Sequence, residues 1–155
     1  MGARLILDQQ DLPPASRLVV LVPDFSIDEI AMGRGIRELA QMTCSDILFL
    51  SAVRNLDEEM ISLHRMASLH ACAHDRLIHV QTRLEFGLSW QKAVRQIWQP
   101  GNLIVCCPDH EIRCNLFQRR ALGELLAHDL KMPVYVLADC YRRDGVSRQR
   151  DHSRG

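Results

Sequence analysis

The feature that most constrains the fold of this sequence is a regular alternation of short apolar runs with longer stretches of helical periodicity. Two runs, 18–22 (LVVLV) and 103–107 (LIVCC), are continuously apolar and are each followed at once by Pro-Asp. Short apolar runs that end at a chain breaker are typical of strands buried on both faces. Three further strands are predicted at 47–50, 77–84 and 134–138, and the alternation within 77–84 suggests a sheet edge.

Helices are predicted between these strands. The first is expected to be capped by Ser26 and to continue to about residue 40, and the others are expected at 56–74, 90–98 and 116–130. Strict alternation of this kind predicts an open, doubly wound α/β fold: a five-stranded, mainly parallel sheet with helices on both faces.

The 155 residues fit one domain, which we expect at 18–140. Residues 1–17 are interpreted as a leader, in which residues 5–7 would add a short edge strand. From Arg142 onward the chain has few apolar residues, so 141–155 is predicted to be a disordered tail.

Composition and charge argue against several classes of protein. The formal net charge is zero and 47% of the residues are hydrophobic, so neither a nucleic-acid nor a membrane partner is expected. No apolar run approaches the roughly 20 residues of a membrane helix, and the N-terminal apolar stretch is too short for a signal peptide. We therefore expect a cytoplasmic protein, whose six cysteines do not form a disulfide framework.

The predicted sheet indicates where a ligand would bind. In open α/β sheets, ligands occupy the crevice beyond the carboxyl ends of the strands, where the strand order reverses. This rule selects residues 23–25 after the first buried strand, 51–54 after the second and 108–115 after the fourth.

Three segments carry a resemblance to a known family. They are 18–26 (LVVLVPDFS), 93–110 (AVRQIWQPGNLIVCCPDH) and 119–137 (RRALGELLAHDLKMPVYVL). The first resembles the opening strand of the universal stress proteins, with Asp24 and Ser26 at the positions of that family's Asp and small residue. The last has Leu122-Gly123 and Pro133-Val134 at matching positions. The resemblance, over about 18–138, implies an adenine-nucleotide alpha-hydrolase-like fold and a homodimer that pairs through the last strand at 134–138.

The glycine-rich motif of the ATP-binding family members is mostly absent. Where that motif, G-x2-G-x9-G followed by Ser or Thr, has its first two glycines, this chain has Cys107 and His110. Gly123 matches the third glycine, Glu124 replaces the hydroxyl residue, and the spacing is three residues longer. Because a carboxylate repels a triphosphate, ATP is not expected to bind in the usual manner. Three arginines would offer compensating charge: Arg113, Arg119 and Arg120.

These features favour a non-enzymatic stress-response or regulatory protein, since no catalytic signature is present. One alternative is an AMP- or ATP-binding member with an altered phosphate loop. Its candidate contacts are Pro23, Asp24, Phe25, Val53, Cys107, Gly123 and Glu124. Another alternative is a thiol or metal sensor that uses the loop at 107–114, with Cys107, His110 and Cys114 as candidate ligands.

Overall fold

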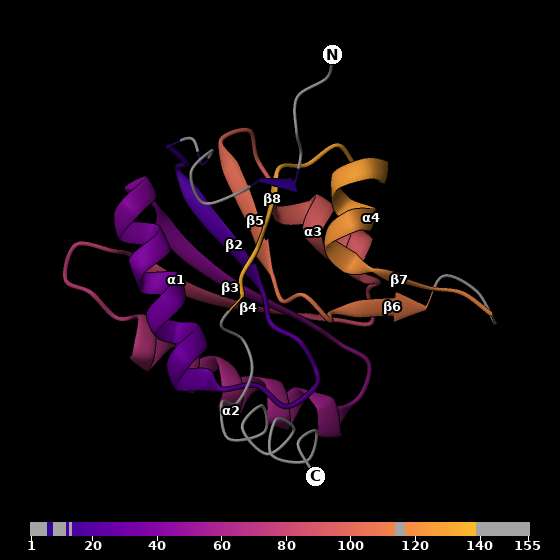
Figure 1. Cartoon of the computed structure of the whole chain (residues 1–155). Helices are drawn as coiled ribbons and strands as arrows, with labels where there is room; N and C mark the ends of the chain where they lie inside the picture. The colour runs from indigo at the N-terminus through magenta and orange to yellow at the C-terminus, as the bar shows by residue number, and fades with distance from the viewer. Residues whose placement is uncertain (1–5, 8–11, 13, 114–116, 139–155) are drawn as a thin grey trace, which may run out of the picture.

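The computed structural model describes residues 6–7, 12, 14–113 and 117–138 (Figure 1). Residues 1–5, 8–11 and 13 of the predicted leader and all of the predicted tail at 141–155 lie outside this part of the chain. The elements, in chain order, are β1 (Ile6–Leu7), β2 (Arg17–Leu21), α1 (Glu29–Thr43), β3 (Asp46–Val53), α2 (Leu56–Ala73), β4 (Val80–Phe86), α3 (Trp90–Ile97), β5 (Asn102–Cys106), β6 (Glu111–Arg113), β7 (Arg119–Ala121), α4 (Leu122–Asp129) and β8 (Val134–Val136).

Six strands form one sheet in the order β1-β8-β5-β2-β3-β4, and every pairing in it is parallel. The prediction of an open α/β fold is confirmed. The sixth strand, in addition to the five predicted ones, is the short edge strand suggested for residues 5–7: Ile6 and Leu7 of β1 pair with β8. A separate antiparallel pair, β6 and β7, was not predicted.

Helices cover both faces of the sheet (Figure 1). Leu18 and Val20 of β2 face a core that includes Ile36 of α1 and Leu69 of α2. The intervening Val19 belongs to a second core, which α3 and α4 complete. A strand buried on both sides must be apolar at every position, which is why 18–22 reads as one continuous run. No helix in the described part of the chain is long and apolar enough to cross a membrane.

Two predicted helix starts are wrong. The first helix is capped by Asp28, whose Oδ1 accepts the N–H of Ala31 at 3.1 Å, and not by Ser26. The helix predicted at 116–130 begins only at Leu122, because 119–121 pair with 111–113 as β7 and β6. The N–H of Leu122 then donates to the carbonyl of His110 at 2.7 Å, which ties the start of α4 to the turn between β5 and β6.

The edges of the sheet also differ from expectation. The last strand, β8, lies between β5 and β1, so it has no open edge for the homodimer pairing at 134–138 that the resemblance implied. The outermost strand at the opposite side is β4, which confirms the expectation of an edge there. This strand starts at Val80 instead of residue 77, because the Asp75 carboxylate accepts the N–H of Leu77 and holds a turn before it.

Candidate functional site

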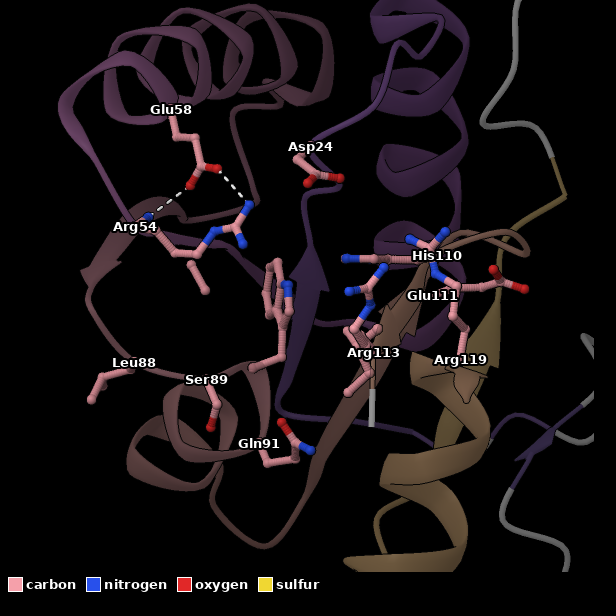
Figure 2. A pocket seen from close by; sticks show the side chains of 13 residues that line it. Asp24, Arg54, Glu58, Leu88, Ser89, Gln91, His110, Glu111, Arg113 and Arg119 are labelled. Atoms are coloured by element: carbon pink, nitrogen blue, oxygen red, sulfur yellow. Dashed lines mark hydrogen bonds and ion pairs between the residues drawn. The ribbon is translucent and has the colours of Figure 1, made fainter. Parts of the chain in front are cut away.

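The strand order reverses beside β2, which has β3 on one side and β5 on the other. A cavity of about 630 Å³ lies at the carboxyl end of the sheet at this point (Figure 2). Its position is the one that the rule for doubly wound sheets predicts. Its lining residues come from the segments that follow β2, β3, β4 and β5, and from the β6–β7 pair: Asp24, Ala52, Arg54, Glu58, Leu88, Ser89, Trp90, Gln91, His110, Glu111, Ile112, Arg113 and Arg119.

Asp24 lies in a turn that α2 holds in place. Nη1 of Arg65, in the middle of α2, donates to the carbonyl of Pro23 at 2.6 Å. Nε of the same side chain lies 3.6 Å from the Glu29 carboxylate at the start of α1. A hydrogen bond from a charged donor stabilises more than one between neutral groups, so this contact fixes the backbone beside Asp24.

A second ion pair forms the wall on the α2 side. The Glu58 carboxylate accepts both Nη2 of Arg54, at 2.9 Å, and the backbone N–H of Arg54, at 2.7 Å. The hydrogen bond from the Arg54 side chain is the main reason that the pKa of Glu58 is lowered, and the same bond raises the pKa of Arg54. The two charges largely neutralise each other.

His110 forms the inner wall of the cavity and is only 3% exposed. Its ring lies edge-on to Phe25, with centroids 6.0 Å apart, and to Trp90, at 4.9 Å. Burial lowers its pKa to about 4, although the charge of Asp24 acts in the opposite direction. The ring is therefore neutral at pH 7, and its Nδ1 has no hydrogen-bond partner among the described residues.

The β6–β7 pair brings two arginines to the cavity. Arg113 lies directly opposite Arg119 in the strand register, and both side chains line the cavity with Glu111 beside them. Figure 2 shows Arg113 and the Arg54–Glu58 pair on opposite sides of the cavity. Like charges placed opposite each other across two strands destabilise the pair, so this arrangement favours an anion between them.

The structure brings only some of the predicted site residues together. Asp24 and His110 line the cavity, and Phe25, next to Asp24, contacts His110. Pro23 is buried behind them and contributes its carbonyl to Arg65.

The other predicted residues lie elsewhere. Cys107 is buried in the core with α1 and α2, and Val53 is buried at the end of β3. Gly123 is buried in α4, where an added Cβ would meet Sγ of Cys106 at 2.8 Å, and Glu124 is exposed on α4; neither residue lines the cavity. Cys114 is outside the described residues, among which no group of three or more His, Cys, Asp or Glu side chains is placed to hold a metal.

Several lining residues were missed by the sequence reasoning. Ser89, Trp90 and Gln91 follow the carboxyl end of β4 and reach the cavity from there. The rule that selected the segments after the other strands applies equally to this one. Residues 87–91, between the third predicted strand and the helix that follows it, could therefore have been predicted to line the cavity.

Comparison with known proteins does not assign the chain to a family. No protein-family model matches the chain, and no curated protein matches its sequence. The cavity and the charges that line it are therefore the basis for assigning a function.

Proposed function

We propose that this chain is a non-enzymatic regulatory protein of the universal stress type, which responds to a small anionic ligand in the cavity beside β2. The observation that carries the proposal is the placement of Arg113 opposite Arg119 on the cavity wall. Guanidinium groups present a planar set of donors that matches phosphate and carboxylate oxygens. An anion bound between the two arginines would offset their mutual repulsion.

Two features support a mode of binding that differs from a glycine-rich phosphate loop. The chain between β5 and α4 forms the β6–β7 pair, with arginines where a loop would offer backbone N–H groups. Gly123 packs against Cys106 and Val134, so its missing side chain serves helix–strand packing. We therefore propose that arginine side chains, and not backbone N–H groups, bind the phosphate.

AMP or ATP is the second candidate, and the size of the cavity favours it. A volume of about 630 Å³ falls within the range of small-molecule sites. With the phosphates on Arg113 and Arg119, the sugar or base of a nucleotide would lie toward Asp24 and Trp90. Both AMP and inorganic phosphate therefore belong in the test.

Calorimetric titration of the purified chain with AMP, ATP and inorganic phosphate tests the proposal. The Arg113→Ala/Arg119→Ala variant should bind the anion about tenfold more weakly or worse, which corresponds to the loss of one or two charged hydrogen bonds. The matched control is Arg76→Ala/Arg95→Ala, which removes two exposed arginines outside the cavity. No binding of any of the three probes, or equal binding by the two double variants, would refute the proposal.

Two further measurements separate the alternatives. Asp24→Asn should weaken AMP binding and leave phosphate binding unchanged if a nucleotide is the ligand. Metal analysis of the same preparation addresses the sensor hypothesis: stoichiometric zinc that disappears in Cys114→Ser would favour it over an anion receptor.

A further inference from the structure

Strand β4 offers a row of backbone groups at the open side of the sheet. The N–H of Gly87 donates to the carbonyl of Val53, and the carbonyl of His79 accepts the N–H of Ile47, so the odd-numbered residues here face β3. Because successive residues of a strand point their N–H and C=O groups in opposite directions, those of the even-numbered residues face outward. Among the described residues, no strand pairs with this side of β4.

Helix α2 carries exposed apolar side chains on the same side of the molecule. Leu56, Met60 and Leu63 are 70%, 71% and 49% exposed and follow the i, i+4, i+7 spacing of one helical face. Arg65 contacts the turn before α1, and Cys72 packs against Gly33 of α1. At 100° per residue, both residues lie about 160° around the helix from the exposed apolar face. The apolar face therefore points away from α1, past β4.

Phe86 extends this apolar surface onto the strand. Val80 and Leu84 of β4 pack into the core beneath α1 and α2, so Phe86, which is also even-numbered, projects to that side of the sheet. Its side chain is 53% exposed. We call the surface formed by Leu56, Met60, Leu63 and Phe86 the outer patch. Helix α2 and β4 are neighbours in the fold, and exposed apolar side chains on adjacent elements are typical of an interaction site.

We infer that this edge is an interface with a second copy of the chain, in which the two β4 strands pair antiparallel with Leu84 on the two-fold axis. In this register the outward-facing residues form the hydrogen-bonded pairs, Leu84 with Leu84 and Thr82 with Phe86. The sheet then continues from one copy into the other. The two outer patches lie on the same side of this sheet and pack against each other.

The charges of β4 select this register. With Leu84 on the axis, Arg83 of each copy lies opposite Glu85 of the other. An axis at Arg83 or at Glu85 would instead place like charges opposite each other, which is destabilising. The strand is therefore complementary to itself in one register, as an interface with two-fold symmetry requires.

Charged side chains also protect unpaired edges, but the arrangement of Arg83 and Glu85 does not serve that purpose. Lys and Pro, which protect many natural edges, are absent from β4. Nε of Arg83 lies 2.5 Å from the Glu85 carboxylate of its own strand, so the pair presents little net charge to an approaching strand.

Sedimentation velocity of the full chain over a range of concentrations tests the inference. The expected species has twice the chain mass of 17.7 kDa. Thr82→Pro should give a monomer, because it removes an outward N–H that β3 does not use. Met60→Lys should also raise the dimer dissociation constant by about tenfold or more. Ile30→Lys is the matched control, since Ile30 on α1 is 56% exposed and lies outside the outer patch.

A mixing experiment tests the register itself. Arg83→Glu alone and Glu85→Arg alone each put like charges across the axis and should be monomeric. An equimolar mixture of the two variants restores opposite charges between chains, although not within either chain, and should be dimeric. Circular dichroism establishes that each variant is folded. A wild-type chain that stays monomeric, a dimer unaffected by Thr82→Pro, or a mixture that stays monomeric would each overturn the inference.

Discussion

The imidazole of His110 stands edge-on to the indole of Trp90, with ring centroids 4.9 Å apart and an interplanar angle of 88°. One residue follows β5 and the other begins α3, so the contact joins the two sides of the cavity. Edge-to-face packing of this kind is a favourable geometry for two aromatic rings. Burial there keeps His110 uncharged, and this gives the cavity a measurable dependence on pH.

Stability should fall between about pH 6.5 and pH 4 because of His110. Its pKa is lowered to about 4 in the folded chain, so over this range the unfolded chain binds a proton that the folded chain does not. The free energy of unfolding should therefore drop by up to about 3 kcal/mol as the pH falls through this window, with no further loss from this group below it. Urea unfolding at several pH values measures the change.

His110→Gln removes this proton and should flatten the pH dependence over the same window. His64→Gln, on the exposed surface of α2, is the control and should retain the wild-type profile. Equal pH profiles for His110→Gln and the wild type would contradict the role assigned to burial.

Gly123→Ala should destabilise the fold by about 1–3 kcal/mol, the usual cost of adding a methyl group to a packed core. The new Cβ would lie 2.8 Å from Sγ of Cys106 and 3.4 Å from Cγ1 of Val134. Gly35→Ala is the matched control in α1, where the nearest atom, of Leu137, would be 3.6 Å away. That variant should be neutral or more stable, by up to about 1 kcal/mol, because Ala favours helix. Thermal unfolding of both variants provides the comparison, and equal effects would contradict the packing argument.

Asp28→Ala should lower the free energy of unfolding by about 1 kcal/mol, because it removes the side chain that accepts the N–H of Ala31. Ser26→Ala, at the position that the sequence pattern favours as a cap, should change it very little. A larger effect at Ser26 than at Asp28 in chemical denaturation would place the start of α1 earlier than the structure has it.

Arg65→Met should destabilise the chain by about 1–3 kcal/mol, because the buried carbonyl of Pro23 loses a charged donor at 2.6 Å while the apolar bulk is kept. Arg65→Lys, which retains a charged donor, should recover part of this loss. Chemical denaturation measures both, and identical stabilities for the two variants would show that only the aliphatic part of Arg65 matters.

The elements that the sequence predicts well are those whose local pattern and tertiary environment agree. The run at 18–22 is apolar throughout because β2 is covered on both faces, and the segment 56–74 keeps a helical period with Asn55 as its cap. The β6–β7 pair has no such local signal. Residues 119–121 (Arg-Arg-Ala) form a strand only because 111–113 lie alongside, and the leucines after them extend a helical pattern backward over the same residues.

The position of the candidate site was predictable from the sequence, but only some of the residues that line it were. The strand rule leads to Asp24 and to the loop of His110, because both follow buried strands near the reversal of strand order. The resemblance to a family motif led instead to Gly123 and Glu124, which do not line the cavity. Residues 111–113 and 119–121 form β6 and β7 before α4, and Gly123 is the second residue of that helix.

The hydrogen bond from Arg65 to the carbonyl of Pro23 links α2 to the turn that carries Asp24 in the cavity wall. Leu56 and Met60 lie on one side of this helix, and Arg65, on the other, holds the turn that carries Asp24. A partner that binds α2 and rotates it about its axis would displace the turn that carries Asp24. A ligand bound against Asp24 would oppose this rotation. Coupling of this kind is reciprocal, so occupancy of the cavity and association of the helix would each alter the affinity of the other.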